Sequence, residues 1–238
     1  MFYLGCSIEC LGVRCLNVYI KDPQLPAQAC VIWMHGLGSN SQNMMALADQ
    51  FLLTAPVRHV FIDAPVRPVT VNNNQSMRAW YDITGLTISS REDRVGIHES
   101  EARVLEVLSE QNNAGFSNRQ IFLAGFSQGG AMALHTGLNL PDPMGGIIVL
   151  SAYLPLASER PDVHQLETPV FIAAGTLDNV VPTEWTRSIH SWLLARGFHD
   201  VELQEYLMDH SICAKEIRDI SNWLNKRISL NIKQGNCG

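Results

Sequence analysis

The chain has 238 residues, of which 46% are hydrophobic and 17% are charged, and its formal net charge is −6 at pH 7. This composition excludes disorder over most of the chain, and the negative charge argues against a broad non-specific hold on nucleic acid or on an anionic membrane. The apolar runs are far shorter than the roughly 18 residues of a membrane-spanning helix, so no integral membrane segment is expected.

The spacing of the six cysteines indicates that they are reduced and not paired in disulfides. They form no Cys-x-x-Cys pair and no Cys/His grouping with zinc-finger spacing, and a chain of this length does not need disulfides to stabilise its core. The N-terminus also lacks the charged start and the apolar stretch of a secretory signal. We therefore expect a cytoplasmic protein with free thiols.

Residues 1–14 show no clear hydrophobic period, and we expect an N-terminal extension there, ahead of one domain over residues 15–238. Five short apolar runs are typical of buried strands in a parallel sheet with helices on both faces. These runs are residues 31–34, 60–62, 121–124, 147–150 and 170–173. Residues 201–206 alternate apolar and polar side chains, which predicts a strand nearer an edge of the sheet.

The segments between these runs have apolar residues at helical spacing. Apolar stripes at helical spacing predict core-facing helices over residues 97–108, 185–193 and 217–228, and a further helix is expected over 128–140. Thr183 is a candidate N-cap of its helix. Because strands and helices alternate with no Ser-, Gly- or Pro-rich linker between them, the sequence predicts a single α/β domain.

Residues 64–96 interrupt this alternation. They contain prolines, three consecutive asparagines, aromatic residues and several charges, with no sustained period. A long irregular segment in a compact domain is usually functional or mobile, although a surface insertion with no role remains the alternative.

A candidate nucleophile follows the strand over residues 121–124. Gly125-Phe126-Ser127-Gln128-Gly129 matches the G-x-S-x-G nucleophile elbow, and a helical segment comes directly after it. In an elbow the serine occupies a sharp strand-to-helix turn, and the glycines allow neighbouring backbone to approach closely. The positive end of the helix dipole then lies at the reaction site. We predict that Ser127 is a catalytic nucleophile.

Serine needs a base and an orienting acid, which in α/β-hydrolases follow it in the order acid, then histidine. Asp178 comes just after the strand over 170–173, and His210 just after 201–206, so both are expected at the carboxyl edge of the sheet. The rival bases fit less well by position or order; they are His135, His164, His190 and His199. The rival acids are Asp142, Asp162, Glu167 and Glu184.

An oxyanion hole is predicted beside the nucleophile. One donor is expected to be the backbone N–H of Gln128, which follows Ser127, and the other should come from the loop after an early strand. His35-Gly36-Leu37-Gly38 follows the strand over 31–34, and we assign the second donor to Leu37. His35 is expected to shape this loop rather than to exchange protons.

Taken together, these motifs resemble the carboxylesterase/acyl-protein thioesterase family of α/β-hydrolases, also called the phospholipase/carboxylesterase family. The resemblance covers residues 28–228 and rests on ordered matches along the chain. They include Trp33-Met34-His35-Gly36-Leu37-Gly38, Met77-Arg78-Ala79-Trp80-Tyr81-Asp82-Ile83, Gly125-Phe126-Ser127-Gln128-Gly129-Gly130, Gly175-Thr176-Leu177-Asp178 and Met208-Asp209-His210-Ser211.

The resemblance implies an α/β-hydrolase fold and a Ser127–Asp178–His210 triad, with Leu37 and Gln128 as oxyanion donors. It also implies that residues 64–96 form a substrate-side loop in which Trp80 lines an acyl groove. The implied activity is cleavage of short- to medium-chain acyl esters or thioesters, with an acylated protein or a lysophospholipid as a further substrate. The resemblance implies no metal or organic cofactor. It does imply a homodimer.

Two other functions stay open at this point. A non-catalytic binding protein could use the same fold, although such proteins typically lack part of the triad. A related hydrolase could act on another bond, such as a lactone or a peptide.

Overall fold

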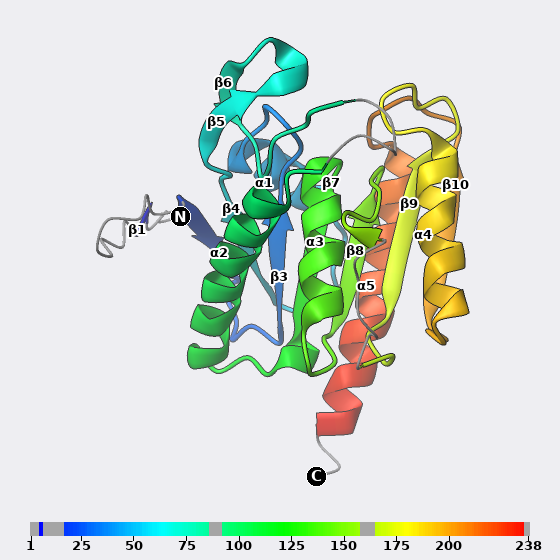
Figure 1. Cartoon of the computed structure of the whole chain (residues 1–238). Helices are drawn as coiled ribbons and strands as arrows, with labels where there is room; N and C mark the ends of the chain where they lie inside the picture. The colour runs from blue at the N-terminus through cyan, green and yellow to red at the C-terminus, as the bar shows by residue number, and fades with distance from the viewer. Residues whose placement is uncertain (1–4, 7–16, 86–91, 158–164, 236–238) are drawn as a thin grey trace.

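A computed structural model describes residues 5–6, 17–85, 92–157 and 165–235 (Figure 1). A central sheet has the strand order β1-β2-β4-β3-β7-β8-β9-β10. The strands from β4 to β10 in this order are parallel to one another, and β1 and β2 are antiparallel to their neighbours. The sheet strands are β1 (Gly5–Cys6), β2 (Val18–Lys21), β3 (Ala29–Met34), β4 (Val57–Ile62), β7 (Ile121–Phe126), β8 (Gly146–Leu150), β9 (Val170–Gly175) and β10 (Val201–Tyr206).

Helices cover both faces of this sheet, as the sequence predicted. Alternate residues of each strand point to opposite faces, so β3 sends Ile32 into one hydrophobic cluster and Trp33 into the other. One cluster is covered by α2 (Arg94–Asn113), α3 (Gln128–Asn139) and α4 (Thr183–Ala195). The other is covered by α1 (Ser41–Ala48) and α5 (Ala214–Gly235). Figure 1 shows the first three helices in front of the sheet and the other two behind it.

The predicted strands and helices all form, and β10 lies at an edge of the sheet as expected. The structure corrects one detail of α4, because the backbone of Pro182 precedes the first helical residue and Thr183 lies inside the helix. The Thr183 hydroxyl donates to the carbonyl of Gly175 at 2.7 Å, which ties α4 to the end of β9.

The segment over residues 64–96 is more regular than its sequence suggested. It contains a hairpin of β5 (Val66–Val69) and β6 (Gln75–Arg78), joined by the short 3₁₀ helix η1 (Thr70–Asn72). Asn73 and Asn74 have positive φ at the turn, a conformation that asparagine tolerates. Most of the hairpin side chains are at least partly exposed, so no apolar alternation marked its strands. A second 3₁₀ helix, η2 (Asn118–Gln120), precedes β7.

The structure shows the state of two cysteines. Cys30 is buried and Cys213 is partly buried, and both are free thiols. Among the described residues, no helix combines the length and the apolar character needed to cross a membrane. The expected extension over residues 1–14 lies outside the described residues, except for the short strand β1.

Candidate active site

Ser127 occupies a strained turn between β7 and α3. Its backbone has φ 54° and ψ −122°, a conformation that costs free energy and that marks functional positions in folded proteins. The neighbouring glycines make this turn possible. A Cβ atom on Gly125 would overlap the backbone of Gly129, and one on Gly129 would overlap the carbonyl of Met34. Strand, turn and helix therefore form the nucleophile elbow that the motif predicted.

A chain of hydrogen bonds links Ser127 to His210 and Asp178. Nε2 of His210 lies 3.0 Å from Oγ of Ser127, and Nδ1 lies 2.7 Å from Oδ2 of Asp178. The other carboxylate oxygen of Asp178 accepts from the backbone N–H groups of Val180 and Val181, each at 2.8 Å. The carboxylate is thus fixed on both sides, and it can hold one tautomer of the His210 ring toward Ser127.

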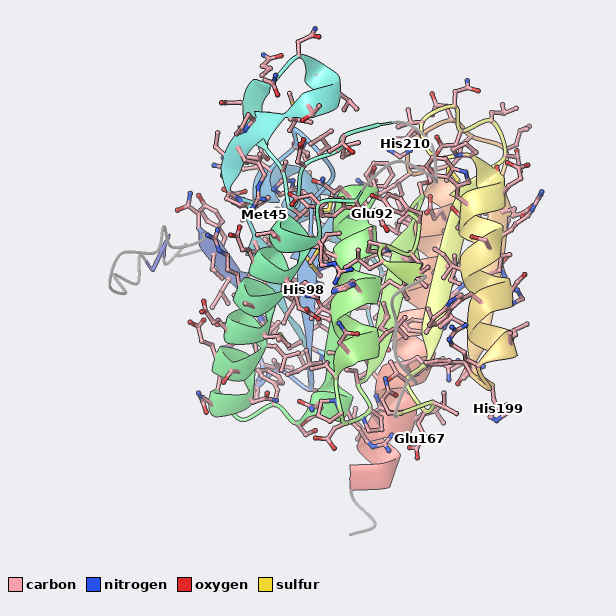
Figure 2. The ribbon with its side chains drawn as sticks, in the orientation of Figure 1. Met45, Glu92, His98, Glu167, His199 and His210 are labelled. Atoms are coloured by element: carbon pink, nitrogen blue, oxygen red, sulfur yellow. The ribbon has the colours of Figure 1, made fainter. Side chains whose placement is uncertain are left out.

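The three side chains come from the carboxyl ends of β7, β9 and β10, where the sequence placed them. His210 lies at the upper end of the sheet in Figure 2, whereas His199 lies at the opposite end. Two other rivals are within helices: His190 in α4 and His135 in α3. His164 and Asp162 lie outside the described residues.

The loop after β3, in which an oxyanion donor was expected, lies beside the elbow, with Gly36 close to Ser127. Gly36, Leu37 and Gln128 line the same cavity as Ser127. Within the part of the chain that the structure describes, the backbone N–H groups of Leu37 and Gln128 donate to no protein acceptor. Two such donors in the cavity of a serine hydroxyl are available to a developing oxyanion.

His35 holds this loop in place through two hydrogen bonds of its buried side chain. Nε2 of its fully buried ring accepts from the backbone N–H of Ala64 at 3.0 Å, which puts the ring proton on Nδ1. Nδ1 then donates to the carbonyl of Gly36 at 2.7 Å. Burial lowers the pKa of His35, which favours this neutral form. The structural role expected for His35 therefore has a defined set of contacts.

Trp80 lies elsewhere than expected. Its side chain is fully buried, and its indole N–H donates to the carbonyl of His35 at 2.9 Å, behind the oxyanion loop. The neighbouring Tyr81 lines the cavity, and Trp80 is not among the lining residues. In this structure Trp80 does not line the groove as expected, because its side chain is fully buried against the backbone of the oxyanion loop. Trp80 therefore supports the oxyanion loop through its hydrogen bond to His35.

The side chain of Gln128 holds the segment around Trp80 in place, a contact that the sequence did not predict. Its buried side chain accepts from the backbone N–H of Trp80 at 2.9 Å and donates to the carbonyl of Tyr81 at 2.7 Å. The residue that follows Ser127 thereby ties the start of α3 to the segment after the β5–β6 hairpin. The only sequence signal for this contact was the position of Gln128 in the elbow.

A cavity of about 900 Å³ opens beside Ser127. Its size falls near the upper end of the range for small-molecule sites, which is roughly 300–1,000 Å³. Its wall combines residues of helices from both faces of the sheet. The apolar lining residues include Met44 and Leu47 of α1 and Trp185, Ile189 and Trp192 of α4. A long apolar group can therefore lie next to the serine hydroxyl.

Comparisons with known proteins agree with this geometry. A sequence profile described as Phospholipase/Carboxylesterase matches residues 16–228. The chain belongs to the phospholipase/carboxylesterase family. The family match confirms the predicted resemblance and the α/β-hydrolase fold, and it makes the chain a member of a hydrolase family.

Individual members of the family are similar over nearly the whole chain. Acyl-protein thioesterase 1 of Yarrowia lipolytica is 34% identical over 218 residues, which cover 86% of this chain and 96% of that protein. Acyl-protein thioesterase 1 of Mycosarcoma maydis is 36% identical over 223 residues, or 84% and 91% of the two chains. The crystal structure of Arabidopsis thaliana SOBER1 superposes with a TM-score of 0.77 at 29% identity, covering 84% of this chain and 99% of that one.

Proposed function

We propose that this protein is a serine hydrolase that cleaves acyl esters or thioesters through Ser127, His210 and Asp178. The observation that carries the proposal is the hydrogen-bonded chain from Ser127 through His210 to Asp178, at the edge of a large and mostly apolar cavity. The family membership supports the same chemistry.

The reaction begins when Oγ of Ser127 attacks the acyl carbonyl carbon while Nε2 of His210 takes the hydroxyl proton. The carbonyl oxygen becomes an oxyanion and accepts hydrogen bonds from the backbone N–H groups of Leu37 and Gln128. When the tetrahedral intermediate collapses, His210 gives its proton to the departing alcohol or thiol. The acyl group is then bound to Ser127 as an ester.

Water completes the cycle by the same route. His210 accepts a proton from the water as its oxygen attacks the acyl-enzyme, and it returns the proton to Oγ of Ser127 when the acid leaves. Asp178 stabilises the positively charged ring of His210 in both halves of the reaction, and no proton needs to reach its carboxylate.

The natural acyl donor is proposed from the relatives. Since similar proteins are named acyl-protein thioesterases, an acylated protein is the donor that we favour over a lysophospholipid. Homodimer formation and a cytoplasmic location stay predictions.

The test compares p-nitrophenyl butyrate, a matched S-acyl thioester peptide, a lactone and a peptide amide as substrates of the purified full chain. We expect turnover of the ester and the thioester, and its loss in Ser127→Ala. Ser229→Ala, an exposed serine on α5, serves as the matched control. Full turnover by folded Ser127→Ala would refute the assignment of the nucleophile, and turnover of only the lactone or the amide would refute the bond class.

A further inference from the structure

A second cluster of chemically active side chains lies where α2 packs against α3, apart from the catalytic residues. Oε2 of Glu101 is 3.1 Å from Nδ1 of His98 and 3.3 Å from Nε2 of His135. Oε1 of Glu101 accepts from the amide of Asn139 at 2.5 Å. His98 and Glu101 belong to α2, and His135 and Asn139 to α3, so the cluster joins the two helices. Figure 2 shows His98 in the space between them.

The spacing of these atoms fits a tetrahedral metal ion. Zn²⁺ binds histidine nitrogen and carboxylate oxygen at ~2.0–2.2 Å, so two of its ligand atoms lie roughly 3.3 Å apart. The two measured distances to Glu101 are close to that value, and one ligand atom from each of the three residues lies within 4.8 Å of the others. Nε2 of His135 also lies 3.3 Å from the amide nitrogen of Asn139, a contact that an ion would replace.

The surroundings suit a metal site as well. The side chain of His135 is 3% exposed and that of Glu101 is 12% exposed, whereas His98 is 55% exposed and leaves a path from solvent. His98 and Glu101 are three residues apart and share one face of α2, which fixes the relative positions of these two ligands.

We propose that His98, Glu101 and His135 form a Zn²⁺ site, with water as the fourth ligand. The ion would bind α3, whose first residue follows the nucleophile, to the neighbouring helix α2. His135 lies eight residues along α3 from Ser127, which is ~12 Å at 1.5 Å per residue. The ion is therefore too far away to contact the reacting atoms, and its effect is on the stability of the helix pair.

Zn²⁺ titration of the chelator-treated full chain tests the proposal, with calorimetry and thermal unfolding as readouts. We expect one saturable site, and a rise in Tm because the ion binds the folded state in preference to the unfolded chain. His98→Gln and Glu101→Gln should weaken binding by about tenfold or more and should abolish the rise in Tm. His199→Gln, an exposed histidine at the other end of the sheet, is the matched control and should bind as the unchanged chain does.

Zn²⁺ can also bind the catalytic histidine, and a fourth variant separates the two sites. In His210→Ala the saturable site and the rise in Tm should persist. The proposal fails if the unchanged chain shows no saturable binding, if His98→Gln binds as tightly as His199→Gln, or if binding disappears in His210→Ala.

Discussion

Asp178 is the residue on which the orientation of His210 depends. Replacing it with asparagine puts an N–H₂ group or an amide oxygen against Nδ1 of His210 in place of the carboxylate oxygen at 2.7 Å. The ring can then take the tautomer that donates toward Ser127 rather than accepting from it. We expect Asp178→Asn to lower kcat for p-nitrophenyl butyrate by about 10³- to 10⁴-fold, as in other serine hydrolases with this triad.

The matched control is Asp209→Asn, which changes the exposed neighbour of His210 and should leave kcat nearly unchanged. Thermal unfolding of both variants shows whether the fold survives. A folded Asp178→Asn enzyme with an undiminished kcat would move the acid of the triad to another residue.

Glu216, in the first turn of α5, makes folding stability depend on pH. Its carboxyl is fully buried, and burial raises its pKa from 4.5 to about 8, with the N–H of Cys213 opposing the rise and Asp219 adding to it. The unfolded chain therefore releases this proton near pH 4.5, while the native chain keeps it to about pH 8. As pH rises through this window, the free energy of unfolding should fall.

Glu216→Gln removes the titrating group and keeps its shape. We expect urea unfolding to show that this variant loses less stability than the unchanged chain between pH 5.5 and pH 8.5, and that it is the more stable of the two at the higher pH. Glu184→Gln, on the exposed surface of α4, should follow the unchanged chain. Equal pH dependence in all three proteins would show that Glu216 does not titrate in this window.

At the scale of elements, Gln128 connects the start of α3 to the segment over residues 79–82. Gln128→Ala keeps the backbone N–H that faces the oxyanion but leaves the N–H of Trp80 and the carbonyl of Tyr81 without their partner. Each buried polar group without a partner costs ~1–3 kcal/mol. We expect a lower Tm and a kcat reduced by about tenfold or more, because oxyanion donors act only when they are held in position.

Steady-state kinetics and thermal unfolding check this expectation against Gln204→Ala on β10, whose side-chain amide donates to Glu202 on the same strand. If Gln128→Ala lowers Tm and leaves kcat intact, the contact supports the fold without positioning the oxyanion hole.

The helices and strands that the sequence predicted are those with a strong apolar pattern. The central strands are buried on both faces, and α2 to α5 carry apolar residues at helical spacing. The elements that were not predicted are short or largely exposed: β2 is only partly buried, α1 spans eight residues, and the β5–β6 hairpin projects beyond the sheet in Figure 1. β2 and the hairpin bury too little surface to impose a period on their sequence. α1 buries Met44, Leu47 and Ala48 but is too short to repeat its pattern.

At the scale of the whole molecule, the candidate site unites residues that are far apart in the chain. The order of Ser127, Asp178 and His210, each after a strand, was enough to predict which end of the sheet they share. The position of Trp80 was not predictable in this way. Whether Trp80 or Tyr81 faces the cavity depends on the path of a loop between the hairpin and α2, and a loop has no fixed alternation of side chains.

The cavity too is formed only by the complete fold, since α1 and α4 reach it from opposite faces of the sheet. Each methylene that moves from water into an apolar wall gains ~0.8 kcal/mol, which corresponds to roughly a fourfold increase in kcat/KM. We expect kcat/KM for p-nitrophenyl esters to rise with each added methylene from acetate until the cavity is filled. Trp192→Ala should change the chain length at which the rise stops.

A flat series from acetate to octanoate would contradict an acyl-binding role for this cavity. The matched control is Leu230→Ala on α5, which changes an exposed leucine outside the cavity. It should leave the chain-length profile unaltered. Trp223→Ala is unsuitable as a control because it removes a buried core side chain.

In the proposed reaction, Ser127 forms a covalent intermediate with the help of His210. The most direct measurement is labelling of the full chain with a fluorophosphonate, followed by peptide mapping by mass spectrometry. We predict one modified residue, Ser127, and a strongly reduced labelling rate in His210→Ala and Asp178→Asn. Labelling at another residue, or no labelling of an active and folded enzyme, would refute this role of Ser127.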